Sequence, residues 1–593
     1  MTIHDFWQTL QIRREADFLV LPGLTVTYGQ MQSLVLRWLA RFDALRLVEG
    51  NCILIRTANE PAAISAFLAA LLDGVVPVMQ VPDTPDSRTL SVAQLADATM
   101  LVADEQADAA PLSTELPQVT VARIHDASLE GAEGPRDLVP GLPLEAAARA
   151  PRLPTDPDGP AYLLFTSGTT SSPAGVQITR ANLCANLTTL SRLFGYDAHS
   201  RIFNDMILAH ADGLVQGPLL ALANGCATVR AGGFRLGDLE DWLNRVRQEH
   251  CSHVITVPTI WAMIDAYAAR DDYFEAPECR ALLSVAAKIP DQLWTRLETR
   301  FKRPLFNQYG LTETVASATY AGPHPEMGAR FTVGKPVDCE ARISSQHGEC
   351  EGELELRGDN VFPGYWRNAE RTAETFTADG WMKTGDLARR EPDGSYSILG
   401  RLKTVIMSGG FLIRPDEIDE AMVRHPAVRE SATVAIEDEM FGEVPVTAVV
   451  CATPVAENEL TAHARAALEN QKVPKRIIAL DAIPRGDAGK AQVRKLHDIL
   501  LAEMASHETR AADAGPANVA AEVIAVAADV FRVDPGTLTL DSQHGEIAGW
   551  DSFSHLILVM EVEQRYSIAI PANRIAALRT LGDMVRTVEE LAR

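Results

Sequence analysis

The chain has 593 residues, more than one hydrophobic core usually organises, so its length predicts three or more folding units. Hydrophobic residues make up 47% and charged residues 22%, as in ordinary globular protein, which excludes collagen, coiled coil and bulk disorder. The formal net charge of −25 argues against nucleic acid as a partner, because phosphate backbones are bound by clustered Lys and Arg.

Three features predict a cytoplasmic protein without a membrane partner. Residues 1–14 lack the basic start and apolar run of a signal peptide. The most apolar stretch, residues 62–81, is interrupted by Asp73, Gly74 and Pro77, so we expect no transmembrane span. The eight cysteines are scattered singly, without metal-ligand spacing, and we expect reduced packing residues.

Residues 25–450 alternate helix-period segments with short β-branched runs, such as 62–72 followed by 75–81. This rhythm predicts an α/β fold with largely parallel sheets.

The pattern changes near residues 400–403, which predicts a large N-terminal domain over 1–399 and a small α+β subdomain over 400–502. Residues 503–518 are small and polar with a Gly-Pro pair, so they are interpreted as a linker. Residues 519–593 hold three or four helical segments, including 522–531, 552–565 and 581–592, which is enough for an all-α bundle.

Three segments in the large domain combine hydroxyls, carboxylates and glycines. Residues 165–176 (FTSGTTSSPAGV) follow an apolar run and offer the N–H and O–H donors that wrap phosphates, although a surface loop has the same composition. In residues 309–313 (YGLTE) a carboxylate beside a hydroxyl is suited to Mg²⁺, and a helix cap is the alternative. In residues 381–387 (WMKTGDL) Asp386 is expected in a turn, as a ribose ligand or a structural residue.

Taken in order, these segments resemble the adenylate-forming superfamily of acyl-CoA synthetases, luciferases and peptide-synthetase adenylation domains. The resemblance covers roughly residues 20–500. It is supported by further motifs at 352–358 (GELELRG), 364–368 (GYWRN), 400–403 (GRLK), 408–419 (SGGFLIRPDEID) and 484–490 (PRGDAGK).

The resemblance implies an ATP- and Mg²⁺-dependent ligase and assigns residues by position. The phosphates of ATP would be bound by the loop Thr166, Ser167, Gly168, Thr169 and Thr170, and the α-phosphate also by Thr312. Glu313 would hold the metal. Asp386 and Arg401 would hold the ribose, and Tyr309 would line the pocket. The resemblance also implies that Lys490 bridges the acyl carboxylate and the phosphate, that Lys403 is the hinge and that Gly409 and Gly410 replace Lys490 for the second half-reaction. A positioned ammonium suits this chemistry, because negative charge builds on the α-phosphate in the transition state.

The chain departs from the superfamily pattern at two places. Ser171 and Ala174 stand where the phosphate loop usually carries Gly and Lys, so one charge toward the pyrophosphate is missing. Val285 and Ala286 replace a usual glycine pair and are expected to crowd the substrate pocket.

The motif at 208–213 (LAHADG) bears on the acid substrate. His210, a catalytic candidate, falls where acyl- and aryl-CoA ligases carry His and amino-acid-activating relatives carry Asp. An α-amino acid is therefore disfavoured, although Asp212 lies two residues on. Lys288 is interpreted either as a partner for a second carboxylate or as a surface lysine.

Residues 549–556 (GWDSFSHL) place Ser552 after an aspartate at the start of an amphipathic helix, which by itself is explained by a helix cap. The segment also resembles acyl and peptidyl carrier domains, and this resemblance implies 4′-phosphopantetheine on Ser552. A carrier implies a phosphopantetheinyl transferase and downstream synthase or synthetase enzymes as partners.

The sequence thus predicts an enzyme that activates a small carboxylic acid as an acyl-adenylate and loads it on its own carrier for a peptide- or polyketide-type pathway. Two alternatives stay open: a free acid–CoA ligase with a vestigial carrier, and a non-catalytic carrier scaffold.

Overall fold

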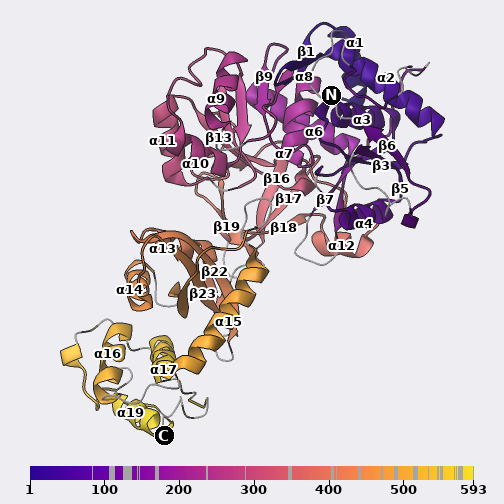
Figure 1. Ribbon diagram of the computed structural model, residues 1–593. Helices are drawn as coiled ribbons and strands as arrows, with labels where there is room; N and C mark the ends of the chain where they lie inside the picture. Colours follow the sequence, from indigo (N-terminus) through magenta and orange to yellow (C-terminus); the bar gives the residue numbers. More distant parts are fainter. Residues whose placement is uncertain are drawn as a thin grey trace. The chain divides into compact units, whose positions relative to one another are not determined.

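The computed structural model describes most of the 593 residues. The residues outside the description are 83, 106–113, 125–136, 143–144, 146, 148, 167–172, 235–237, 288, 345–349, 403–405, 409–410, 439–441, 469–471, 486–491, 512–518, 532, 534, 544–546, 548–549, 551, 567, 569, 572–573, 575–577 and 592–593. The chain divides into two compact units, Met1–Leu399 and Gly400–Arg593, each of which is described by itself (Figure 1).

The first unit is built on a nine-stranded sheet in the order β15-β14-β13-β12-β11-β9-β10-β1-β2. Its strands are β1 (Asp17–Leu21), β2 (Leu24–Thr27), β9 (Arg201–Asn204), β10 (Ala227–Val229), β11 (His253–Thr256), β12 (Ala281–Ser284), β13 (Leu305–Tyr309), β14 (Thr319–Ala321) and β15 (Lys335–Pro336). The strands from β13 to β1 pair in parallel, whereas β2, β14 and β15 pair antiparallel at the two edges.

A second sheet has six strands in the order β6-β5-β3-β4-β7-β8. They are β3 (Cys52–Arg56), β4 (Val76–Met79), β5 (Ala98–Asp104), β6 (Thr120–Ile124), β7 (Pro160–Thr166) and β8 (Ala174–Thr179). All pairs are parallel except the hairpin β7–β8. A third sheet contains β16 (Cys339–Ser344), β17 (Glu351–Gly358), β18 (Met382–Arg390) and β19 (Tyr396–Arg401).

Helices cover both faces of the parallel sheets. They are α1 (Ile3–Ile12), α2 (Tyr28–Ala44), α3 (Glu60–Asp73), α4 (Asp86–Ala96), α6 (Arg180–Phe194), α7 (Ala211–Leu214), the π-helix η1 (Val215–Leu219), α8 (Leu220–Asn224), α9 (Leu239–Gln248), α10 (Pro258–Tyr267), α11 (Asp291–Phe301), the 3₁₀ turn η3 (Thr312–Thr314) and α12 (Ala369–Thr375). Residues of α9, α10 and α11 pack on one face of the nine-stranded sheet, and residues of α1, α2, α3, α6 and α8 form the larger core (Figure 1).

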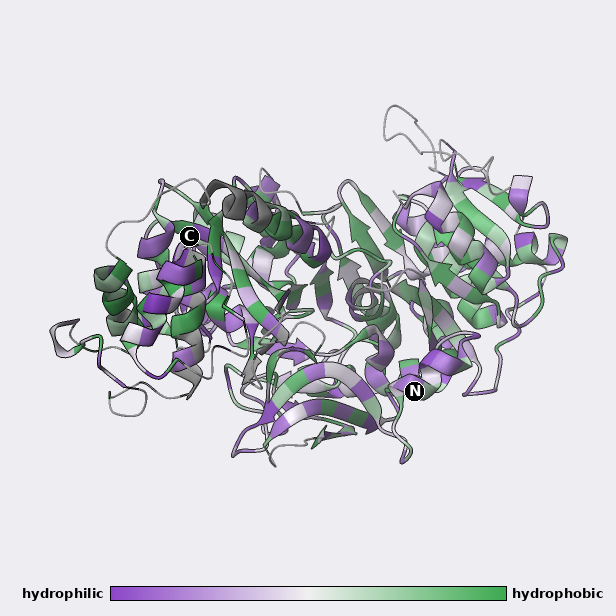
Figure 2. Ribbon diagram, turned by 90° about the horizontal axis from the view of Figure 1, so that it is seen from below, coloured by the Kyte–Doolittle hydropathy of each residue, from purple (hydrophilic) through white to green (hydrophobic). Residues whose placement is uncertain are grey.

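Local sequence explains several of these elements. Helix α2 begins with a capping box, in which the Thr27 hydroxyl accepts from Gln30 N and the Gln30 side chain accepts from Thr27 N. Helix α3 is apolar on every side, and all its residues after Glu60 are buried. It ends at Gly74, whose φ of 80° lies in the left-handed region. In Figure 2 the strands and the buried helices are largely green, while outward-facing helices carry purple residues.

The second unit contains a sheet in the order β21-β20-β23-β22, with β24 parallel to β23. Its elements are β20 (Ile406–Ser408), β21 (Phe411–Ile413), α13 (Pro415–Val423), β22 (Val428–Asp438), β23 (Gly442–Cys451), α14 (Glu457–Ala467), β24 (Arg476–Ala479) and α15 (Val493–Ala511). Two apolar clusters flank this sheet, one that includes residues of α13 and α14 and one that includes Leu496 and Leu500 of α15.

The C-terminal segment forms the expected helices α16 (Val519–Phe531), α17 (Ser552–Tyr566) and α19 (Leu581–Leu591), with the 3₁₀ turn η6 (Pro535–Thr537). Their apolar faces enclose a separate core around Trp550 and Leu558. Helix α15 continues to Ala511, so it runs into the segment interpreted as a linker; residues 512–518 lie outside the described residues.

The predicted mixed α/β class with parallel sheets is confirmed. The eight cysteines are free thiols, and five of them are buried. Within the described part of the chain, no helix has both the length and the apolar character needed to cross a membrane.

Candidate active site

The predicted phosphate loop joins β7 to β8, and Thr166 is the last residue of β7. In this hairpin Phe165 pairs with Gly175 and Thr166 with Ala174. A Cβ on Gly175 would lie 2.9 Å from the Phe165 ring, so this position has no room for a side chain. The predicted loop residues Ser167, Gly168, Thr169 and Thr170 lie outside the described residues.

Two buried polar groups lie side by side on adjacent parallel strands, one at the last residue of β12 and one in the carboxyl-terminal half of β13. Ser284 of β12 pairs in register with Asn307 of β13. Asn307 Nδ2 donates to the carbonyl of Thr332 over 3.0 Å. Asn307 Oδ1 and Ser284 Oγ are buried and find no hydrogen-bond partner among the described residues. Because a buried unpaired polar atom is costly and the carboxyl edge of a parallel sheet is where such folds bind ligands, this is a candidate ligand contact.

Asp386 lies close to Tyr309, as the motifs require if both serve one site. The Tyr309 hydroxyl donates to Asp386 Oδ2 over 2.6 Å, across 77 residues of sequence. The expectation that Asp386 lies in a turn was wrong, since it lies within β18.

A β-bulge explains how a strand residue presents this carboxylate. Pairing between β17 and β18 shifts register between Glu353 and Glu355. Gly385, opposite this shift, has a φ of 71°, and its N–H donates to Glu353 Oε1 over 3.0 Å. Bulges bend a strand and re-aim its side chains, so the Gly385-Asp386 pair substitutes for the predicted turn.

Thr312 and Glu313 form the 3₁₀ turn η3 directly after β13. Glu313 Oε1 accepts a hydrogen bond of 2.8 Å from the Tyr365 hydroxyl. Burial, and then the neighbouring Glu313 carboxylate, raise the pKa of Tyr365 to about 12, so the phenol is a proton donor at neutral pH. A carboxylate has two oxygens. The hydrogen bond to Oε1 fixes the orientation of the Glu313 carboxylate and leaves Oε2 able to bind a ligand.

His210 is the exposed N-cap residue of the short helix α7. Asp212, in the same helix, accepts a hydrogen bond from Gln216 Nε2 over 2.8 Å. Burial raises the pKa of Asp212 to about 6. The following turn is the π-helix η1, which holds Pro218 and has non-helical angles at Gly217. Such turns are frequent at functional sites.

The replaced glycine pair lies at the end of β12. Val285 is buried, so its side chain packs in the core. Ala286 is exposed and has a φ of 66°, a left-handed conformation that costs a residue with a Cβ roughly 1–2 kcal/mol. The replacement thus places backbone strain at Ala286, and crowding of the substrate pocket stays a prediction. Lys288 lies outside the described residues.

The remaining predicted residues belong to the second unit. Arg401 is the last residue of β19, and Ser552 is the first residue of α17. Lys403, Gly409, Gly410 and Lys490 lie outside the described residues.

Trp550, two residues before Ser552 in the sequence, belongs to an aromatic pair. Trp550 is buried, stacks on Phe531 with ring centroids 4.6 Å apart and donates to His555 Nδ1 over 3.1 Å.

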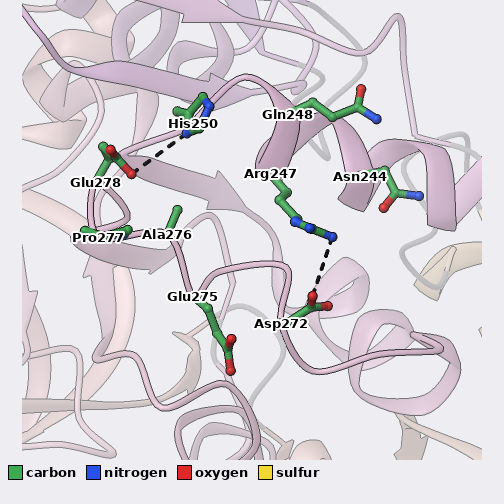
Figure 3. A pocket seen from close by; sticks show the side chains of 9 residues that line it. All are labelled: Asn244, Arg247, Gln248, His250, Asp272, Glu275, Ala276, Pro277 and Glu278. Atoms are coloured by element: carbon green, nitrogen blue, oxygen red, sulfur yellow. Dashed lines mark ion pairs between the residues drawn. The ribbon is translucent and has the colours of Figure 1, made fainter.

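A surface cavity of about 680 Å³ lies elsewhere in the first unit, at the end of α9 (Figure 3). Arg247 pairs with Asp272 and His250 with Glu278 across it. Its lining contains three carboxylates, which repel a triphosphate, and none of the residues predicted from the motifs lines it. We therefore do not place the nucleotide there.

The sequence analysis assigns no role to Tyr365, although it lies in the motif at 364–368, and none to Asn307. Neither role is visible in the linear sequence, because each depends on a long-range contact. The position of Asn307 two residues before Tyr309 of the YGLTE motif is the signal that could have identified it.

Family models agree with this arrangement. The model of AMP-binding enzymes matches residues 6–366, that of the AMP-binding enzyme C-terminal domain matches 417–490, and that of the phosphopantetheine attachment site matches 521–588. The first match alone covers more than half of the chain. The chain therefore belongs to the AMP-binding enzyme family, as an adenylate-forming enzyme fused to a C-terminal phosphopantetheine attachment domain.

Similar characterised proteins are CoA ligases. Sulfoacetate–CoA ligase from Cupriavidus necator is 36% identical over 366 residues, which are 60% of this chain and 70% of the relative. Oxalate–CoA ligase from Arabidopsis thaliana is 32% identical over 58% of this chain and 68% of the relative. 2-Succinylbenzoate–CoA ligase from Bacillus subtilis is 26% identical over 84% of this chain and 98% of the relative. The chain is an AMP-forming acid–thiol ligase.

Solved structures share the fold. ATP-bound MatB from Rhodopseudomonas palustris has a TM-score of 0.75 at 22% identity and covers 84% of this chain and 99% of its own. The o-succinylbenzoate CoA synthetase from Bacillus subtilis, solved with ATP and a magnesium ion, has a TM-score of 0.71 at 25% identity and covers 83% of this chain and 98% of its own.

Proposed function

We propose that this enzyme converts a carboxylic acid and ATP into an acyl-adenylate and transfers the acyl group to a phosphopantetheine thiol on its own Ser552. The observation that carries the proposal is the presence, in one chain, of an acid-activating domain and a phosphopantetheine attachment domain. The thioester then serves downstream synthase or synthetase enzymes of a peptide- or polyketide-type pathway.

The described residues fit ATP. Asn307 Oδ1, which is buried and accepts no hydrogen bond from any described residue, suits an N–H donor such as the adenine amine. Asp386, held by Tyr309, suits the ribose hydroxyls, with Arg401 as a second ribose contact. Thr166, Ser167, Gly168, Thr169 and Thr170 are proposed to wrap the phosphates. Glu313 and Thr312, in one turn, suit a magnesium ion and the α-phosphate, since carboxylate oxygens are preferred Mg²⁺ ligands.

In the first half-reaction a carboxylate oxygen of the acid attacks the α-phosphorus, and pyrophosphate leaves. Mg²⁺ neutralises charge on the phosphates when it is bound. Lys490 is proposed to stabilise the charge that develops between carboxylate and phosphate. For the second half-reaction, phosphopantetheine on Ser552 would supply the thiol that replaces AMP on the acyl carbon, giving a thioester, AMP and a proton. His210 is proposed to act beside the acyl carbon, and rotation about Lys403 to exchange Lys490 for Gly409 and Gly410.

Covalent attachment of the thiol explains why a carrier in cis is effective. A short flexible tether gives an effective concentration on the order of millimolar. The attached thiol then competes with free coenzyme A without any additional binding contact.

The test is a pyrophosphate-exchange screen with sulfoacetate, oxalate, 2-succinylbenzoate, and branched, aromatic and hydroxylated acids, followed by intact mass of the protein. An acid that supports exchange with the wild type and not with Lys490→Ala supports the proposal. Exchange that persists in Lys490→Ala contradicts the assignment of that lysine.

A second candidate function, free acid–CoA ligation, is favoured by the names of the relatives. The two are separated by rates with coenzyme A for the unmodified and the phosphopantetheinylated protein. Faster turnover with free coenzyme A than with the attached thiol supports free acid–CoA ligation as the function.

A further inference from the structure

The segment between β17 and α12 holds Glu313 at two points. Phe362 N donates to the Glu313 carbonyl over 2.9 Å. The Tyr365 hydroxyl donates to Glu313 Oε1 over 2.8 Å. Backbone and side chain of one carboxylate residue are thus both fixed by partners about fifty positions further along the chain.

The same segment is attached to the strand that leaves the phosphate loop. Tyr365 forms an antiparallel bridge with Val176 of β8. Trp366 N donates to the Gly175 carbonyl over 2.7 Å, and Gln177 N donates to the Gly364 carbonyl over 3.4 Å. Tyr365 therefore links two elements. Its backbone pairs with β8, and its hydroxyl binds Glu313 of η3.

Packing fixes the Tyr365 ring. Tyr365 is 9% exposed. The Phe362 ring meets it edge-on with centroids 5.0 Å apart, and the Arg371 guanidinium lies over it at 4.4 Å. Its backbone N donates to Thr372 Oγ1 over 2.9 Å. A ring held on several sides keeps its hydroxyl in one place.

We infer that Tyr365 is a positioning residue for magnesium: its backbone is fixed on β8 and its hydroxyl orients the Glu313 carboxylate, which would hold the metal. The inference rests on the proposed role of Glu313. Outer partners of metal-binding carboxylates tune affinity by roughly ten- to a hundredfold. Loss of the Tyr365 hydroxyl is accordingly expected to weaken metal binding by about tenfold, with the fold preserved.

The experiment titrates Mn²⁺ into the full-length protein in the presence of α,β-methylene-ATP and follows free Mn²⁺ by electron paramagnetic resonance. Tyr365→Phe removes only the hydroxyl and keeps the ring packing. Tyr396→Phe is the matched control, because the buried Tyr396 hydroxyl donates to the Ala341 carbonyl over 2.8 Å and does not contact Glu313.

Tyr365→Phe is expected to bind Mn²⁺ about tenfold more weakly, and Tyr396→Phe as the wild type does. The double variant Tyr365→Phe/Glu313→Gln is expected to bind no more weakly than Glu313→Gln alone, because the tyrosine acts through the carboxylate. In pyrophosphate exchange, raised Mg²⁺ restores kcat of Tyr365→Phe, which it would not do for a merely destabilised protein.

Unchanged Mn²⁺ binding in Tyr365→Phe, with weakened binding in Glu313→Gln, overturns the inference and leaves the proposed function intact. Additive effects in the double variant also overturn it. Unchanged binding in Glu313→Gln overturns both the inference and the metal role of Glu313.

Discussion

At the scale of single residues, the hydrogen bond from Tyr309 to Asp386 is the contact that ties two distant motifs into one site. Tyr309→Phe deletes the donor and leaves the ring. A hydrogen bond to a charged group contributes about 1.5–3 kcal/mol, so we expect the KM for ATP to rise by about tenfold or more while kcat changes less. Pyrophosphate exchange at varied ATP measures this, with Tyr396→Phe as control. An unchanged KM for ATP would contradict the proposed role of Asp386 in binding the ribose.

The burial of His253 predicts how the stability of the first unit changes with pH. It is fully buried, with Nε2 3.0 Å from the Phe194 carbonyl and Nδ1 2.8 Å from Ser252 Oγ. These partners satisfy the neutral ring, and burial lowers the pKa of His253 to about 4. In the unfolded chain the pKa is about 6.5, so the unfolded state binds the extra proton below this value.

The contribution of His253 to stability is therefore complete above about pH 6.5 and is lost as the pH falls toward 4. At pH 5 the loss is about 2 kcal/mol. Urea unfolding at pH 7 and pH 5 measures it, and His253→Gln, which keeps an amide able to bond to both partners, should lose about 2 kcal/mol less than the wild type over this interval. Equal losses in both proteins would contradict the prediction.

At the scale of elements, the bulge between β17 and β18 positions Asp386. Gly385 has a φ of 71°, so Gly385→Ala costs roughly 1–2 kcal/mol and disturbs the backbone beside the carboxylate. We expect lower stability together with a higher KM for ATP. Gly380→Ala is the matched control, because Gly380 has a φ of 85° and open space where the Cβ of an alanine would lie. It should lose stability without a change in KM.

The sequence predicted the elements better than the contacts between them. The alternation of helices and strands and the C-terminal helices follow from local periodicity and turn residues, and the structure confirms them. The position of Asp386 in a bulged strand could not be predicted, because the register of β17 against β18 is a pairing between segments far apart in sequence.

The same limit applies to the site. Motif order placed Tyr309, Glu313 and Asp386 in one active site, but the role of Tyr365 depends on a hydroxyl that meets a carboxylate 52 residues earlier. Likewise, that the Asn307 oxygen has no partner in the described part of the chain is recognisable only when its burial and its neighbours are known.

At the scale of the whole molecule, the proposed mechanism needs the subdomain after residue 400 to move between the two half-reactions. Proline fixes φ and removes an N–H, so Lys403→Pro should restrict the hinge. We expect pyrophosphate exchange to be retained within about threefold and thioester formation to fall by at least a hundredfold. Single-turnover assays of each step measure the two rates. Equal loss of both would show that residue 403 is not a hinge.

The central claim is that one chain both activates and receives the acyl group. The most direct measurement is intact mass of the phosphopantetheinylated full-length protein after incubation with ATP, Mg²⁺ and an acid that supports pyrophosphate exchange. The wild type should gain the mass of one acyl group that neutral hydroxylamine releases, and Ser552→Ala should exchange pyrophosphate at the wild-type rate without any gain. Acylation of Ser552→Ala under the same treatment, or a wild-type protein that exchanges pyrophosphate and is never acylated, would contradict the claim.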